Sequence, residues 1–485
     1  MTPAPVTLDG QSLTLADVVA VARGNAPVAL DPKALDAVRQ SRRAVEAAVE
    51  RGETIYGVNT GFGRLANVRI PPDQARQLQL NLIRSHASGV GEPLGQDAVR
   101  AMMLLRANVL ARGTSGVRPV LPELLVDMLN RKIHPTVPSQ GSVGASGDLA
   151  PLSHLALAMI GEGDVRVPNP ITLEAKEGLA FVNGTQAQTG LAALLVSDAW
   201  TLWRTAHGAA AMSLEAVRGT PDPFDARIHD ARPHPWQQRS AALLRDLLAE
   251  SEIRESHRDN DPRVQDAYSL RCTPQVLGAV GEGLAFAERI VTTELNAATD
   301  NPLVFGDDIL SGGNFHGQPI ALALDVVAIA LTTLAGISER RLERVVNPDL
   351  SSGLPAFLAH DPGLESGFMT AQIAAAALVA DCRVLATPAS VQSVPTEGNQ
   401  EDIVPMGMSA AWKAGRILAN AERIVAIELL AAAQGLEYLK PLRPAKVVSR
   451  LHAAVRTVSA ALTGDRPLTT DIERIARGIR AGMFV

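Results

Sequence analysis

The most apolar stretch of the chain reads Ile320-Ala321-Leu322-Ala323-Leu324-Asp325-Val326-Val327-Ala328-Ile329-Ala330-Leu331-Thr332-Thr333-Leu334-Ala335-Gly336. It belongs to one of five Ala/Leu-rich segments that are longer than an average globular helix: 185–217, 273–298, 319–344, 366–385 and 408–435. The last four carry little charge on any face. Such helices must be surrounded by other helices, in a central bundle or across a subunit interface. The sequence therefore predicts a mainly α protein with a long-helix bundle core and an oligomeric assembly.

Composition limits the number of domains. The 485 residues are 46% hydrophobic and include no charge-rich or Ser/Gly-rich linker, which favours one or two large cores. Residues 1–184 contain shorter helices broken by Gly- and Pro-rich loops, and we expect them to form a smaller N-terminal region. Residues 185–485 are expected to form the long-helix bundle and the C-terminal helices. Strand signals are short and lie at 165–167 and 303–305.

Charge and cysteine content exclude several classes of partner. The formal net charge is −6 and no Lys/Arg-rich run occurs, so nucleic acid is not expected as a partner. Cys272 and Cys382 are the only cysteines; they predict no disulfide framework, match no metal-ligand spacing and favour a reducing cytoplasm. The stretch 320–336 is interrupted by Asp325 and is too short for a membrane span, so we interpret it as a buried helix and expect no membrane partner.

A turn of very small side chains precedes a predicted helix at 149. It reads Gly141-Ser142-Val143-Gly144-Ala145-Ser146-Gly147-Asp148. The amide of Gly147 has no Cβ to obstruct it and could attack the carbonyl two residues back. Ring closure would consume Ala145, Ser146 and Gly147, and loss of water from Ser146 would leave an electrophilic methylidene carbon. The alternative is an ordinary glycine-rich turn in which Asp148 caps the next helix.

Polar residues in other loops are further candidates, because rigid helical scaffolds place functional groups on loops. Tyr56 begins the glycine-rich run that ends at Gly63, and His86 lies near a predicted helix end. Asn183 precedes a long helix, where it could also serve only as an N-cap.

Later segments add four more candidates. Gln265, Tyr268 and Arg271 are three residues apart and would share one face of a helical turn. Arg271 beside apolar helices needs an anion, which could be a structural carboxylate or that of a substrate. Phe315 lies in a glycine-rich loop, and Glu401 precedes a helix whose dipole it could simply complement.

Together, these seven separated motifs resemble the aromatic amino-acid ammonia-lyases, from Tyr56 to Gln434-Gly435. In that family the Ala-Ser-Gly triplet, here residues 145–147, cyclises autocatalytically to 4-methylideneimidazole-5-one (MIO), and no external cofactor or metal is implied. The resemblance also implies a fumarase/aspartase-like homotetramer whose active sites draw loops from three subunits.

The resemblance assigns roles to individual residues. It implies that Tyr56 removes the β-proton, that Asn183 orients the MIO and the substrate, and that Arg271 binds the substrate carboxylate. The other matches line or support the same site: Gln265, Tyr268 and Phe315. Attack on the MIO by the substrate amine and attack by its aromatic ring both remain open.

Two positions bear on the substrate. His86 disfavours phenylalanine but also occurs in tyrosine lyases. Glu401 favours histidine, because its carboxylate can hydrogen-bond an imidazole, whereas phenylalanine and tyrosine lyases typically carry Gln there. Two departures from the usual pattern are Thr387, where the family commonly has His, and the run 403–405 of Ile-Val-Pro, where many histidine-specific members have His-Val-Ser.

The expected activity is elimination of ammonia from L-histidine to give trans-urocanate, the first step of histidine degradation. The alternatives are a tyrosine or phenylalanine ammonia-lyase, an MIO-containing aminomutase, and a non-enzymatic helical assembly protein.

Overall fold

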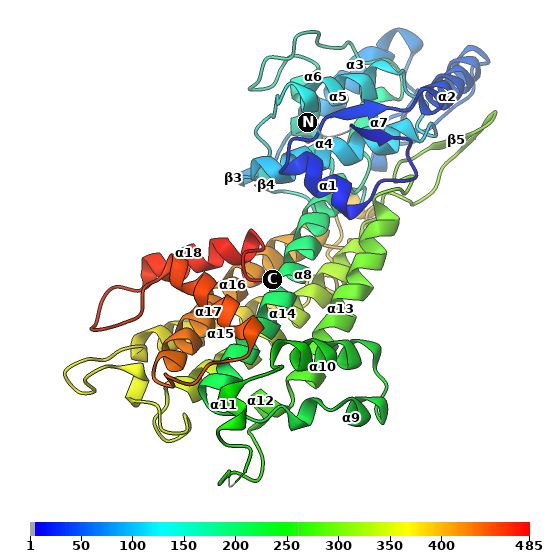
Figure 1. Cartoon of the computed structure of the whole chain (residues 1–485). Helices are drawn as coiled ribbons and strands as arrows, with labels where there is room; N and C mark the ends of the chain where they lie inside the picture. The colour runs from blue at the N-terminus through cyan, green and yellow to red at the C-terminus, as the bar shows by residue number, and fades with distance from the viewer. Residues whose placement is uncertain (1–4, 260) are drawn as a thin grey trace. The chain divides into compact units, whose positions relative to one another are not determined.

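The computed structural model describes residues 5–259 and 261–485, and it is mainly helical as the sequence predicts (Figure 1). Each of the five predicted long helices is confirmed, with boundaries that agree within a few residues. They are α8 (Gln186–Ala216), α13 (Thr273–Glu294), α14 (Gln318–Val346), α15 (Met369–Leu385) and α16 (Gly407–Glu437).

Two compact units make up the chain, and each is assembled from three segments. The first unit consists of Met1–Ser197, Ala287–Asp325 and Pro388–Trp412, and the second consists of Asp198–Phe286, Val326–Thr387 and Lys413–Val485. The region expected at 1–184 therefore lies within the first unit, which also takes in two later segments.

Helix α4 forms the centre of the first unit. It is buried without interruption from Ala98 to Ala111 and contacts α1, α2 and α5. This burial follows from its sequence, which has Ala, Leu, Met or Val on every face. The helices that lie wholly in this unit are α1 (Leu15–Ala22), α2 (Pro32–Glu50), α3 (Ala75–His86), α4 (Gln96–Ala111), α5 (Val120–Asn130), α6 (Leu149–Met159) and α7 (Glu177–Val182), with 3-10 turns η1 (Gly63–Leu65), η2 (Pro72–Gln74) and η5 (Glu397–Asn399).

Strands are few in the described residues, and all of them lie in the first unit. The parallel pair is β1 (Val6–Leu8) with β2 (Val28–Leu30); the antiparallel pairs are β3 (Val90–Pro93) with β4 (Pro138–Gln140), and β5 (Leu303–Phe305) with β6 (Asp308–Leu310). The predicted strand at 303–305 is confirmed as β5. The strand predicted at 165–167 is wrong: these residues are irregular, and Pro168 directly after them has no N–H to donate to a ladder.

The second unit packs around a buried ion pair. The guanidinium of Arg341 donates to the carboxylate of Glu428 at 2.5 and 2.9 Å, and both side chains are fully buried. Ser213 and Ser338 donate their hydroxyls to the same carboxylate. The shorter helices of this unit are α9 (Ala226–Asp230), α10 (Pro235–Leu247), α11 (Glu252–Glu255), α12 (Tyr268–Arg271), α17 (Lys446–Val458) and α18 (Thr469–Arg480), with 3-10 turns η3 (Asp222–Phe224) and η4 (Ala356–Leu358).

Helix α14 contains the apolar stretch that opened the sequence analysis. Among the described residues it is the one helix long and apolar enough to cross a bilayer. In the structure, 67% of its most apolar window is buried, as in the core helix of a folded protein.

Candidate active site

The Ala145-Ser146-Gly147 turn lies just before α6 and is held against residue 184. Gly147 has a φ of +79°, and a Cβ added there would lie 2.3 Å from the carbonyl oxygen of Gly184. The next amide, that of Asp148, donates to the same carbonyl at 2.6 Å. Only glycine meets both the backbone angle and the space at position 147. The glycine that the sequence suggests for ring closure is therefore also the residue that this close packing requires.

Asn183 holds the same turn from the other side. Its Nδ2 donates to the carbonyl of Ser146 at 2.7 Å, while its Oδ1 is buried without a hydrogen-bond partner. Asn183 is the C-cap of α7, so it does not serve as the N-cap of α8. A buried amide with a free acceptor can orient a further group at this turn.

Asp148 occupies the N-cap position of α6, but its side chain makes no capping hydrogen bond to that helix. Its carboxylate instead accepts hydrogen bonds from the amide of Gln188 at 2.8 Å and from the hydroxyl of Ser142 at 3.1 Å. The carboxylate thus satisfies an amide in the first turn of α8, where unpaired N–H groups are available. Burial raises the pKa of Asp148 to about 7.

Tyr56 presents its hydroxyl to the same region. Its oxygen accepts a hydrogen bond from the amide of Gly63 at 3.0 Å, and its ring meets that of Phe62 edge to face. Burial raises the pKa of Tyr56, the carboxylates of Glu397 and Glu401 raise it further, and the Gly63 amide opposes the shift. The amide donor is the one contact here that favours a phenolate.

Glu401 and His86 lie beside Ser146. The hydroxyl of Ser146 donates to Oε1 of Glu401 at 2.6 Å, and the hydroxyl of Thr396 donates to Oε2 at 2.5 Å. His86 is the last residue of α3, and its Nδ1 lies 2.9 Å from the carbonyl of Leu82, which fixes the proton on Nδ1. Burial lowers the pKa of His86, so its ring is neutral at pH 7.

Two cavities of the first unit meet at Ala145, Ser146 and Glu401. One has a volume of about 430 Å³ and is also lined by Tyr56 and Phe315. The other measures about 340 Å³; its further lining includes His86 and Gly147. The structure thus brings together the predicted site residues of the first unit: Tyr56, His86, Ala145, Ser146, Gly147, Asn183, Phe315 and Glu401.

The remaining predicted residues belong to the second unit. Tyr268 and Arg271 are the ends of the short helix α12, and the Arg271 guanidinium lies over the Tyr268 ring, 4.6 Å from its centre. Gln265 precedes this helix and, with Arg271, lines a separate cavity of about 350 Å³. Nε of Arg271 is buried without a hydrogen-bond partner, and no carboxylate pairs with this arginine within 5–259 and 261–485.

Three buried charged side chains were not predicted from the sequence, and one of them, Arg106, supports the segment that holds the turn. Arg106 is fully buried in α4 and donates to the carbonyl of Asn183 at 3.3 Å and to the side chain of Gln186 at 2.7 Å. Burial lowers the pKa of Arg106 to about 10. Lys176 and Asp300 form a fully buried ion pair at 3.0 Å. An arginine inside an apolar helix is a signal that could have identified Arg106, since buried charges need partners.

Glu397, which lines the 430 Å³ cavity, was also missed. Three carboxylates, Glu397, Glu401 and Asp402, fall within six residues of sequence and line one cavity. That density of acidic groups beside a glycine is the signal that could have singled it out.

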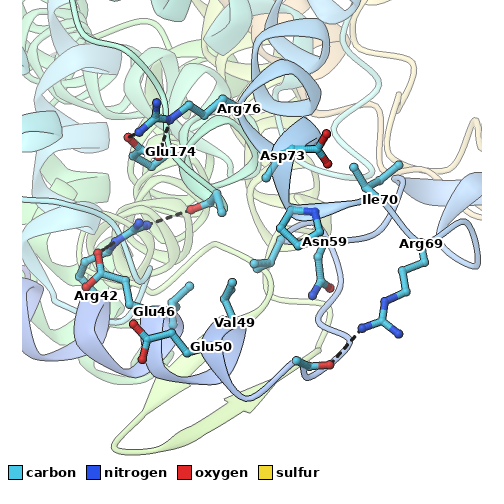
Figure 2. Close-up of a pocket in the computed structure, with 16 residues that line it drawn as sticks. Arg42, Glu46, Val49, Glu50, Asn59, Arg69, Ile70, Asp73, Arg76 and Glu174 are labelled. Carbon is cyan, nitrogen blue, oxygen red and sulfur yellow. Dashed lines mark hydrogen bonds and ion pairs between the residues drawn. The ribbon is translucent and has the colours of Figure 1, made fainter.

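A larger cavity of about 490 Å³ lies elsewhere in the first unit (Figure 2). Its charged groups pair largely with one another, as Arg42 does with Glu46 at 2.7 Å and Arg76 with Glu174 at 2.6 Å. It reaches the Tyr56 loop only at Val58 and Asn59 and includes none of residues 145–147. This cavity is therefore not the candidate active site, although its volume is larger.

Comparison with known proteins identifies the family of the chain. The family model "Aromatic amino acid lyase" matches residues 13–457. The histidine ammonia-lyase of Koribacter versatilis is 52% identical over 98% of both chains, and that of Sorangium cellulosum is 50% identical over 98% of this chain and 97% of its own.

Solved structures have the same fold. The tyrosine aminomutase of Streptomyces globisporus superposes with a TM-score of 0.94 at 42% identity, covering 99% of this chain and 98% of its own. The histidine ammonia-lyase of Trypanosoma cruzi superposes with a TM-score of 0.91 at 44% identity, covering 99% and 94%. The length of the family match and the identity of these relatives show that the chain is a member of the aromatic amino acid lyase family.

Proposed function

We propose that the protein is a carbon–nitrogen lyase that converts L-histidine to trans-urocanate and ammonia in histidine degradation. The observation that carries this proposal is the contact between Ser146 and Glu401, which puts a carboxylate beside the predicted electrophile-forming turn. A carboxylate can accept a hydrogen bond from an imidazole N–H, and a phenyl ring offers no such donor. Relatives at about half identity that are named histidine ammonia-lyase support the same substrate.

The turn at 145–147 has the features that an MIO requires. Gly147 has no Cβ and sits in a conformation that only glycine adopts easily, and Asn183 offers a donor to the Ser146 carbonyl and a free acceptor. When formed, the MIO supplies an electrophile that makes the amino group of the substrate a better leaving group. No external cofactor is needed in this proposal.

The side chains around the turn then bind and orient the substrate. Tyr56 takes the β-proton, and the Gly63 amide stabilises the negative oxygen of its ionised form. Ser146 loses its hydroxyl on dehydration, so Oε1 of Glu401 loses that donor and can accept from the imidazole N–H. Neutral His86 lines one of the two cavities beside the turn, and the Phe315 ring lines the other.

Arg271 binds the substrate carboxylate in this proposal, with Gln265 and Tyr268 beside it. Its guanidinium has no carboxylate partner in the described parts of the chain, and a fork of N–H donors matches a carboxylate in two parallel hydrogen bonds. We propose that the working enzyme is a homotetramer whose sites combine loops of different subunits. Light scattering should then give four times the 51.1 kDa of the chain.

The cytoplasm is the proposed location. Cys272 and Cys382 are free thiols in the structure, and Cys382 is buried. Free cysteines are typical of a reducing compartment.

A product assay tests the substrate. Purified protein should release urocanate from L-histidine faster than it releases coumarate from L-tyrosine or cinnamate from L-phenylalanine. Glu401→Gln should reduce the preference for histidine tenfold or more, the order expected when one buried polar partner worth about 1–3 kcal/mol is lost. Absence of urocanate from active, folded protein would overturn the assignment.

Intact mass tests the electrophile. The mature protein should be lighter than its sequence by two waters, and peptide mapping should locate the loss at 145–147. Ser146→Ala should abolish both the mass loss and turnover. A full unmodified mass would favour a non-enzymatic helical assembly protein instead.

A second candidate is an aminomutase acting on tyrosine. The observation that favours it is the TM-score of 0.94 to the Streptomyces globisporus enzyme. An aminomutase would convert L-tyrosine to its β-amino isomer and retain the nitrogen in the product. Measuring free ammonia and the β-amino acid together distinguishes the two reactions.

A further inference from the structure

Glu397 lies in an unusual turn. Its φ is +50°, and Gly398 and Asn399 follow with φ values of +61° and +67°. Two backbone hydrogen bonds close the turn. The amide of Thr396 donates to the carbonyl of Glu401 at 2.9 Å, and the amide of Asn399 donates to the carbonyl of Thr396 at 3.0 Å. A non-glycine residue in the left-handed region costs energy, and such strain concentrates at functional sites. The left-handed backbone at Glu397 therefore sets the direction in which its side chain leaves the turn.

The carboxylate of Glu397 lies against the backbone that holds Tyr56. A Cβ added at Gly63 would be 1.6 Å from Oε1 of Glu397, so the carboxylate occupies the space that a side chain at 63 would fill. The amide of the same Gly63 donates to the Tyr56 oxygen at 3.0 Å. Glu397 and Tyr56 thus flank one glycine and line one cavity.

Glu397 differs from Glu401 in its hydrogen bonds. Both carboxylate oxygens of Glu401 accept hydroxyl donors, whereas none of the described donors is hydrogen-bonded to the Glu397 carboxylate. Two further carboxylates, Glu401 and Asp402, line the same cavity as Glu397. The other titratable groups nearby are His316, which also lines the cavity, and Arg64 of η1, which lies near Gly398.

We propose that Glu397 is a positioning residue for the base Tyr56, whose phenol it keeps protonated by its negative charge until the positive charge of the substrate enters the cavity that both residues line. The inference rests on the proposed role of Tyr56. Two like charges disfavour each other in a partly buried space, and a cation between them removes that penalty. The phenol proton then passes to solvent, and Tyr56 is a base only when substrate is bound.

The direction of the charge effects agrees with this geometry. Glu397 raises the pKa of Tyr56, and burial together with Glu401 raises the pKa of Glu397 itself. A negative charge beside a phenol disfavours its ionised form. Removing the charge of Glu397 should therefore lower the tyrosinate midpoint of Tyr56.

The chain offers a direct spectroscopic test because it has only three tyrosines. Tyrosinate absorbance is recorded after rapid pH jumps, with and without Tyr56→Phe, so that the difference reports Tyr56 alone. Glu397→Gln should move that midpoint to lower pH and leave the Tyr268 and Tyr438 signals unchanged. Glu92→Gln is the matched control, since Glu92 is an exposed residue of β3, and it should cause no shift.

Two outcomes would overturn the inference. One is an unchanged Tyr56 midpoint in Glu397→Gln, and the other is an equal movement of all three tyrosine signals, which would indicate a structural change. The titration needs no turnover, so failure of the histidine assay would refute the proposed function without refuting this electrostatic coupling.

Kinetics provide the second measurement. The acid limb of the kcat/KM profile should move to lower pH in Glu397→Gln, while KM at the plateau changes less than threefold. Glu397→Asp should restore the wild-type profile because it restores the charge. A large rise in KM with an unmoved profile would instead make Glu397 a substrate-binding group and contradict the proposal.

Discussion

Replacing Gly147 with alanine tests whether the backbone at 147 is as constrained as the structure implies. The added Cβ would lie 2.3 Å from the carbonyl oxygen of Gly184 and 2.4 Å from its nitrogen. Gly184 has little room to retreat, because Arg106, Gln186 and Thr299 fill the space that a Cβ at 184 would occupy. Gly306→Ala is the matched control: Gly306 has a φ of +62° and no atom within 4 Å of an added Cβ.

The two variants differ in a calculable way. Both pay the cost of a left-handed alanine, roughly 1–2 kcal/mol. Gly147→Ala must also push apart atoms that are more than 1 Å too close, and overpacking of this kind costs about 1–3 kcal/mol. The free energy of unfolding should therefore fall by about 1–3 kcal/mol more in Gly147→Ala than in Gly306→Ala.

Urea unfolding measures the stability difference, and intact mass measures ring formation. Gly147→Ala should retain the two waters that the wild type loses, because the methyl group obstructs the amide nitrogen. Gly306→Ala should lose both waters. Equal stability of the two variants, together with complete dehydration of Gly147→Ala, would refute the reasoning about residue 147.

Three further predictions follow from single contacts. Asn183→Ala leaves the Ser146 carbonyl without its donor at 2.7 Å and should lower kcat for histidine about fivefold to a hundredfold in a protein whose circular dichroism is unchanged, a loss of about 1–3 kcal/mol. Burial raises the pKa of Asp148 from 3.8 to about 7, so the folded state keeps a proton that the unfolded state loses, and the contribution of Asp148 to stability should decrease as pH rises from about 4 to about 7; in urea titrations the free energy of unfolding of Asp148→Asn should therefore rise relative to that of the wild type across that range. Arg271→Lys removes the two-pronged donor and should raise KM for histidine about tenfold or more, with a smaller change in kcat, in steady-state assays.

Much of the helical framework could be predicted from local sequence. The five long segments have apolar residues on nearly every face, and only burial among other helices satisfies that pattern, so α8 and α13 to α16 appear where periodicity predicts them. Short elements were less predictable. Residues 165–167 have strand-forming side chains but no partner strand, since Pro168 interrupts the ladder that would have to continue.

The candidate site divides in the same way. The order of the motifs was sufficient to suggest which residues form the candidate site, because the resemblance to the family rests on those residues. The partners of those residues were not predictable: Glu401 lies 255 residues after Ser146 in the chain, and the Asp148 carboxylate bonds the first turn of α8 rather than its own helix.

By itself, the sequence determined the helical class, the long helices, the family and the position of the triplet that we propose forms the electrophile. These depend on hydrophobic period and on residue identity, which are local properties of the chain. Only the tertiary structure decided that Tyr56, Ser146 and Glu401 share one cavity and that the strained Glu397 turn faces the backbone of Gly63. Those facts depend on contacts between distant segments, and packing of the whole first unit determines such contacts.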